Sequence, residues 1–430
     1  MIDIATIKNN AVDAVKGLFR TGFFHIVGAG SLNKALSVLL GIILVRVLSK
    51  ADYGSYAYAY NIVSFFILFN GFGVTSAVLQ ICSEAHKNRN RADANFTYAY
   101  KAGVLVDCFM AVAILIAAIA IPLAIQGSNK LLALYCLYPL LMLLYEMKLM
   151  QLRVNLMNKE YAFATNVQTC LLVGFSILGA FCFQAAGLVI GQGVALLLAY
   201  VFLCWKHPFR RTDELKLDGA EKKDFWGIAS VSAFNNGIGQ ALTLIGTFLV
   251  GFFSMSDELV ANYQVATLVP FGLLFIPVMI MTYCYPYFAR HRDDRTWTLC
   301  NYAKVIGGSL VGMAIISLLV CLLAEPIVVV LFGHQYLDIV PVLRLLMAGF
   351  FVTAALRIPT GNLLVTQRKL LFNTCVGVAS IVICVVSSYI LIPSHGMVGA
   401  AIAYDVTMLF GAVCNVPFYL WAVSKIKKRQ

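Results

Sequence analysis

Apolar residues run along this chain in long, nearly continuous stretches that are separated by short polar segments. About a dozen stretches reach about 20 residues, and a helix rises about 1.5 Å per residue, so each can cross ~30 Å of hydrocarbon. They are too continuous to be the alternating strands of a membrane barrel. The pattern predicts twelve membrane-spanning helices, near Val27–Leu48, Ser55–Gln80, Tyr98–Ile121, Leu131–Leu152, Tyr161–Gln184, Gly187–Trp205, Trp226–Phe252, Leu259–Phe288, Tyr302–Ala324, Ile339–Leu364, Asn373–Ile392 and Gly396–Ala422.

Composition agrees with this pattern. Hydrophobic residues make up 61% of the chain and charged residues only 12%, whereas a soluble domain carries roughly 25% charged residues. Such a chain cannot cover a water-facing surface, which excludes ordinary globular, disordered, collagen-like and coiled-coil proteins and secreted disulfide scaffolds. The predicted fold class is an all-α integral membrane protein.

The net charge of +12 follows membrane topology rather than a nucleic-acid surface. Of the 32 Lys and Arg residues, 23 fall on one side of the predicted spans and only Lys50 and Lys130 on the other, with seven inside spans. The positive-inside rule then places both termini in the cytoplasm. The residues before Val27 lack the pattern of a cleavable signal, so the first span is expected to remain in the protein.

The spans divide six and six about the longest polar segment. Ser49 and Tyr56 recur as Ser256 and Tyr263 at an offset of 207 residues, and other residue pairs repeat at similar offsets. We therefore predict an N-terminal half (1–205), a cytoplasmic linker (206–225) and a C-terminal half (226–430). An even number of spans gives both halves the same orientation, with a pseudo-twofold axis along the membrane normal. Parallel repeats of this kind are typical of transporters, whose substrate site lies between the halves.

Two stretches also resemble a known family. "GAGSLNKALSVLLGIILVRVLSKADYGSYAYAY" is similar to the opening spans of bacterial polysaccharide and O-antigen flippases, and "EPIVVVLFGHQYLDIVPVLRLL" is similar to the family's connection between the ninth and tenth spans. These flippases belong to the multidrug, oligosaccharidyl-lipid and polysaccharide exporter superfamily. The resemblance implies that the first, second, seventh and eighth spans line a central cavity.

Lys34 is the cation that we place nearest to mid-bilayer, about nine residues or roughly 13 Å from the nearer boundary. It shares one helical face, here called the Lys34 face, with Gly30, Ser31, Ser37 and Gly41. Such a face is either a helix contact or a cavity wall, and the buried ammonium favours the cavity wall. In contrast, Arg46, Arg344 and Arg357 are expected to snorkel to the headgroups.

The seventh predicted span carries a second polar stripe, the Thr243 face. It consists of Ser232, Asn236, Gln240, Thr243 and Thr247 at helical spacing. It either holds neighbouring helices together or lines the cavity. Tyr56, Tyr60 and Tyr263 add hydroxylated rings, which suit sugar faces or belong to the interfacial aromatic belt. The predicted substrate-binding residues are Lys34, Ser31, Ser37, Asn236, Gln240, Thr243, Tyr56, Tyr60 and Tyr263.

The charges inside the spans favour an anionic cargo. Seven cations oppose only Asp107, Glu146 and Asp405, a net excess of four positive charges. A lipid diphosphate would suit this excess through charge-assisted hydrogen bonds, whereas an exporter of organic cations would be expected to show the opposite sign. Asp107 and Asp405 are candidate sites for coupling to a proton or sodium gradient, or they neutralise buried cations.

No catalytic, metal-binding or nucleotide-binding constellation is present in the sequence, and we expect no cofactor. The twelve Cys residues are scattered without metal-site spacing and are interpreted as small buried hydrophobes. No nucleic-acid partner is expected. These observations favour a protein that is not an enzyme and does not consume ATP.

The resulting functional hypothesis is a flippase of the bacterial inner membrane. It would move a polyprenyl-diphosphate-linked oligosaccharide from the cytoplasmic to the periplasmic leaflet by alternating access. Expected partners are this lipid-linked substrate, membrane lipids, a polysaccharide polymerase and a chain-length regulator. The alternatives are an ion-coupled multidrug exporter of the same superfamily and a membrane-embedded glycan polymerase or acyltransferase, which the short outer loops disfavour.

Overall fold

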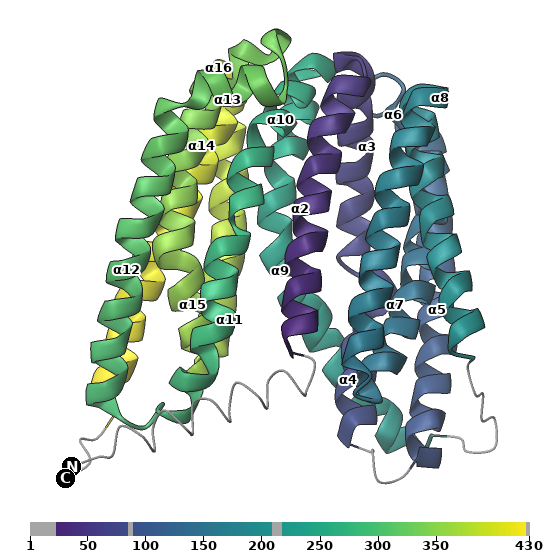
Figure 1. Ribbon diagram of the computed structural model, residues 1–430, viewed down its shortest axis with the longest axis vertical. Helices are drawn as coiled ribbons and strands as arrows, with labels where there is room; N and C mark the ends of the chain where they lie inside the picture. The colour runs from purple at the N-terminus through teal and green to yellow at the C-terminus, as the bar shows by residue number, and fades with distance from the viewer. Residues whose placement is uncertain (1–22, 85–88, 209–216, 427–430) are drawn as a thin grey trace. The chain divides into compact units, whose positions relative to one another are not determined.

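The computed structural model describes residues 23–84, 89–208 and 217–426, and every regular element in these ranges is helical (Figure 1). The helices are α2 (Phe23–Val47), α3 (Lys50–Ile67), α4 (Val74–Glu84), α5 (Arg89–Ala120), α6 (Ser128–Leu134), α7 (Tyr138–Val154), α8 (Asn158–Lys206), α9 (Gly219–Ser254), α10 (Asp257–Leu273), α11 (Phe275–Arg290), α12 (Arg295–Leu322), α13 (Ala324–Leu331), α14 (Val340–Val352), α15 (Ile358–Thr366) and α16 (Leu370–Ser424). The short elements are η1 (Asn70–Gly73), η3 (His334–Ile339) and the π-helical turn η4 (Thr353–Arg357).

The two longest helices, α8 and α16, each fold back on themselves. In α8 the backbone leaves helical geometry at Phe183 and Gln184. The arms on either side meet at Gly179 and Gly187, where a Cβ on either glycine would overlap the carbonyl group of the other. In α16 the break lies at Gly396, which has a positive φ of 55°. Both breaks fall where the sequence predicts that one span ends and the next begins.

Among the described residues, nine helices are long and apolar enough to cross a membrane. Counting each hairpin as two passages and adding α9 brings the number to twelve, in agreement with the predicted spans. The chain is thus an all-α, multi-pass membrane protein.

Four predicted spans are interrupted rather than straight, and the fourth is divided between α6 and α7. The second is broken at η1, where Gly71 and Phe72 have positive φ angles of 54° and 50°. The eighth is divided between α10 and α11, and the tenth contains the π-helical turn η4. Hydropathy does not register such breaks because the residues on both sides remain apolar.

Contacts group the described residues into two compact units. Unit 1 contains the described residues up to Leu40 together with Phe69–Ala120 and Ala133–Phe234. Unit 2 contains Gly41–Leu68, Ile121–Leu132 and the chain from Asn235 onward. The division into halves at a 206–225 linker remains a prediction.

The core of unit 1 forms where α4, α5, α7 and the start of α9 meet. Val74, Phe96, Leu143 and Phe225 are each at most 6% exposed and pack into one apolar cluster. Gly73 completes the contact because a Cβ there would overlap the carbonyl oxygen of Ala229. Gly73, the last residue of η1, therefore allows this part of the chain to approach α9 closely.

Unit 2 depends on a similarly close contact between α3 and α10. A Cβ on Gly54 would overlap the backbone carbonyl of Asp257, and Tyr58 lies against Gly251 of α9. Near the same end, the Lys50 ammonium group forms a 2.9 Å ion pair with Glu258. Because the contacts at Gly54 and Gly251 are made where a side chain would not fit, the glycines determine the spacing of these helices.

Candidate functional site

The Lys34 face of α2 is open over most of its length. Lys34 and Ser37 are exposed, and a Cβ on Gly30 would meet no atom within 4 Å. The Ser37 hydroxyl donates to the Asn33 carbonyl of its own helix at 2.8 Å. Only Gly41 is tightly packed, since a Cβ there would lie 3.2 Å from Leu268. Around Lys34 the face therefore makes no close contact with another helix of the described residues.

The predicted tyrosines differ in accessibility. Tyr56 stacks on Tyr60 with ring centroids 5.8 Å apart, and Tyr60 is 37% exposed. Tyr263 is only 2% exposed and fills the space beside Gly246, where a Cβ would lie 2.6 Å from its hydroxyl oxygen. Tyr60 can offer a ring face to a ligand, whereas Tyr263 packs between helices in this structure. Their roles at a substrate remain predictions.

The Thr243 face divides into exposed and buried residues. Gln240 and Thr243 are exposed, and the Thr243 hydroxyl donates to the Gln240 carbonyl at 2.7 Å. Thr247 is only 2% exposed and donates to Gln264 Oε1 on α10 at 2.8 Å, so this end of the face holds two helices together. The side chain of Asn236 lies outside those described.

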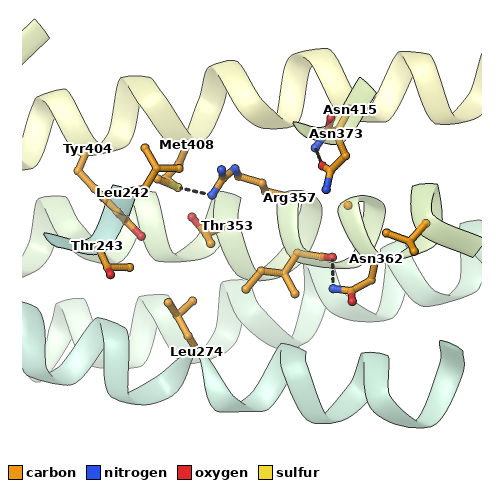
Figure 2. Close-up of a pocket in the computed structure, with 13 residues that line it drawn as sticks. Leu242, Thr243, Leu274, Thr353, Arg357, Asn362, Asn373, Tyr404, Met408 and Asn415 are labelled. Carbon is orange, nitrogen blue, oxygen red and sulfur yellow. Dashed lines mark hydrogen bonds between the residues drawn. The ribbon is translucent and has the colours of Figure 1, made fainter. Parts of the chain in front are cut away.

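A cavity of about 360 Å³ with both polar and apolar lining residues lies within unit 2. Thr243, a predicted site residue, is part of its wall, together with residues of η4, α15 and both arms of α16 (Figure 2). We call it the Arg357 cavity because Arg357 supplies its cationic group.

Arg357 corrects the prediction that this residue snorkels to the headgroups. It lies nine residues before the end of α15 at Thr366, or about 13.5 Å at ~1.5 Å per residue. Its Nη1 lies 3.4 Å from Met408 Sδ, and a Cβ on Gly411 would lie 2.7 Å from its Nε. The guanidinium group is therefore directed toward the second arm of α16. The sequence carries no local signal for this, because the space at Gly411 comes from a residue 54 positions away.

For Arg46 and Arg344, snorkelling to the headgroups remains a prediction. Both are exposed, and both donate to backbone carbonyls at helix ends. Arg46 donates to Leu331 at 2.8 Å and also to Val330, while Arg344 donates to Cys321 at 3.2 Å. These cations satisfy carbonyl groups that lack partners within their own helices.

Asp107 lies on α5 in unit 1, next to η1, which separates α3 from α4. It is fully buried, and its Oδ1 accepts a 2.8 Å hydrogen bond from the backbone N–H of Gly71. Its Oδ2 has no hydrogen-bond partner among the described residues. Asp405 in unit 2 also has a buried, unpartnered Oδ1, which lies against Gly349. Neither acid forms an ion pair within the described part of the chain. Their roles in coupling or in charge neutralisation remain predictions.

Comparison with known proteins identifies the family. The sequence profile of a family of polysaccharide biosynthesis proteins matches residues 43–341. The chain belongs to this family. The chain is also 23% identical, over 283 residues, to a protein of Klebsiella pneumoniae described as an uncharacterized membrane protein in the cps region. That match covers 63% of the present chain and 55% of the relative, so it spans only about half of the relative's length.

Solved structures show the fold of the chain. An inward-facing multidrug resistance MATE family transporter of the MOP superfamily matches with a TM-score of 0.76 and 11% identity, covering 92% of this chain and 95% of that one. The lipid II flippase MurJ in an inward closed conformation matches with a TM-score of 0.75 and 14% identity, covering 93% and 87%. At these identities the likeness concerns the fold alone. The resemblance inferred from sequence is confirmed, and these two structures are of a transporter and a flippase.

Proposed function

We propose that this protein is a flippase that moves a polyprenyl-diphosphate-linked oligosaccharide from the cytoplasmic to the periplasmic leaflet by alternating access. The observation that carries the proposal is the open Lys34 face in a chain that belongs to a polysaccharide biosynthesis family. A lysine this far from the predicted span ends needs water or an anion, because an ammonium group in hydrocarbon is costly. A diphosphate headgroup supplies the anion.

The expected path keeps each part of the substrate in a suitable solvent. Sugar hydroxyls and phosphates lose hydrogen bonds if they enter hydrocarbon, so they would pass through a hydrated interior while the polyprenyl tail stays in lipid. The likeness to the fold of a MATE transporter and of MurJ supports such a route, since a transporter and a flippase both move cargo across membranes. The protein itself would perform no covalent chemistry.

The test is a leaflet assay with purified protein in liposomes. A fluorescent lipid-linked oligosaccharide, initially confined to one leaflet, should become accessible to an impermeant glycosidase on the opposite side without any change in its mass before digestion. Transport of organic cations in place of the glycan would support the multidrug alternative. A covalent change in the glycan would support the enzyme alternative.

Topology provides a separate prediction. Cysteine at Ala220, in a variant whose twelve natural Cys residues are replaced, should resist impermeant thiol reagents in intact cells and react once the membrane is opened. We choose Ala220, which is exposed, because Asp218 caps α9 by accepting a hydrogen bond from the Glu221 N–H at 2.8 Å. Labelling from outside would overturn the proposed inner-membrane orientation and the direction of transport.

Coupling is proposed to involve Asp107, with Asp405 as a second candidate. A buried carboxylate with one unsatisfied oxygen gains a partner when a proton or sodium ion binds, and the bound cation also removes the cost of burying its charge. Asp107→Asn should reduce gradient-driven transport about tenfold or more while leaving substrate binding intact. The measurement is transport into liposomes with and without an imposed proton or sodium gradient.

Asp93→Asn is the matched control for Asp107→Asn, because Asp93 lies on the same helix, α5, and is only partly buried. This control should transport like the unmodified protein. If Asp107→Asn and Asp405→Asn both retain the gradient dependence of the unmodified protein, neither acid couples transport to an ion.

A further inference from the structure

Arg357 is a cation whose charge the described protein does not balance. Its guanidinium group contacts the neutral thioether of Met408, and no carboxylate of the described residues lies within ion-pair distance of it. None of the residues that line the Arg357 cavity is acidic. A guanidinium group placed this deep requires water or an anion, because an unpaired charge in a dry interior is strongly disfavoured.

The neutral groups of the cavity wall are rich in hydrogen-bond donors. Asn415 Nδ2 donates to Asn373 Oδ1 at 3.1 Å, which orients Asn373 so that its own amide nitrogen points away from Asn415 (Figure 2). Thr353 and Tyr404, which both carry hydroxyl groups, also line the cavity, although the Thr353 hydroxyl itself is buried. Amide and hydroxyl donors around a guanidinium group match the several oxygens of a phosphate.

The backbone creates the space for this arrangement. Gly411 leaves room for the Arg357 side chain, since a Cβ there would lie 2.7 Å from Nε and 3.0 Å from Cδ. Arg357 ends the π-helical turn η4, an irregularity that is frequent at functional sites and changes the direction of the side chains that follow. A volume of about 360 Å³ falls within the range of about 300–1,000 Å³ for ligand pockets.

We propose that the Arg357 cavity is a phosphate-binding site that accepts the diphosphate of a polyprenyl carrier. The choice of a lipid-borne diphosphate rests on the proposed function, whereas the affinity for phosphate oxygens rests on the cavity itself. Arg357 binds two phosphate oxygens through its planar guanidinium group, and the amide of Asn373 donates to a third. Lys34 itself belongs to unit 1, whereas every residue that lines the Arg357 cavity belongs to unit 2.

The test measures binding of farnesyl diphosphate and of inorganic pyrophosphate to the full-length protein in nanodiscs by calorimetry. Arg357→Ala should weaken the binding of farnesyl diphosphate at least about tenfold, as expected for loss of hydrogen bonds from a charged group. Arg357→Lys should recover part of the affinity, since lysine keeps the charge but not the bidentate geometry. Gly411→Val should weaken binding while retaining the arginine, because its side chain displaces the guanidinium group.

Arg344→Ala is the matched control. It removes an exposed arginine from α14 of the same unit and should leave binding unchanged. The unfolding midpoint of each variant shows whether it folds. If Arg357→Ala does not fold, Arg357→Lys tests the proposal in its place. If pyrophosphate binds as tightly as farnesyl diphosphate and its binding requires Arg357, the cavity is a site for free anions. That result would overturn the proposal that the bound diphosphate is carried by a lipid.

Two results separate this site from the proposed function. In the first, the unmodified protein moves the lipid-linked glycan, but Arg357→Ala binds farnesyl diphosphate as tightly as the unmodified protein. If Arg357→Ala does not fold, the same comparison is made with Arg357→Lys and Gly411→Val. Unchanged binding means that the site is wrong and the flippase assignment stands. If Arg357 is required for farnesyl diphosphate binding but no glycan is moved, the site stands and the function is wrong.

Discussion

Replacing Lys34 with alanine is expected to remove most of the translocation of lipid-linked oligosaccharide. Lys34 is exposed on the open face of α2, and a point charge at a site of low dielectric constant attracts phosphate more strongly than it does in water. Loss of this interaction should cost about 1.5–3 kcal/mol of binding free energy, the range for hydrogen bonds to charged groups. The rate in liposomes at limiting substrate should therefore fall at least about tenfold.

The transport activity of a series of variants should follow the charge at position 34. Lys34→Arg should retain much of the activity, and Lys34→Glu should be less active than Lys34→Ala because it repels the diphosphate. Lys304→Ala removes an exposed lysine from α12, near a predicted span end, and should behave like the unmodified protein. A fully active Lys34→Ala would show that this lysine does not bind the substrate, although the protein could still be a flippase.

Replacing Gly54 with leucine is expected to disrupt folding of unit 2. The new Cβ would overlap the Asp257 carbonyl, and a backbone group in a packed helix cannot move aside as the end of a flexible side chain can. Overpacking usually costs about 1–3 kcal/mol, and a direct collision with backbone should reach or exceed the upper end. The measurements are the yield of monodisperse protein after extraction and the midpoint of thermal unfolding.

Gly312→Leu provides the comparison, because a Cβ at Gly312 of α12 would meet no atom within 4 Å. Both variants add the same side chain to a membrane helix, so they differ in the space available rather than in hydrophobicity. Equal unfolding midpoints for the two variants would contradict the close contact between α3 and α10.

Residues within a single span could be interpreted well from the sequence. The grouping of Ser31, Lys34 and Ser37 on one face follows from helical period alone, since residues three and four apart share one side of a helix. That this face is open was decided by the structure. The helix breaks near Gln184 and Gly396 were also predicted from the sequence. At each of them a short interruption separates two apolar runs that are each long enough to cross the membrane. Periodicity could not distinguish exposed Thr243 from buried Thr247, since both lie on the same face and only the neighbouring α10 separates them.

The sequence by itself determined that this chain is an all-α membrane protein with about twelve passages, because hydrocarbon imposes one length and one apolar composition on every crossing helix. Its family could also be inferred from local stretches. Only the tertiary structure decided that Arg357 points into a cavity and that Tyr263 fills the space beside Gly246. These outcomes depend on gaps left by glycines far away in the chain, at Gly411 for Arg357, and hydropathy sums over neighbours in sequence rather than in space.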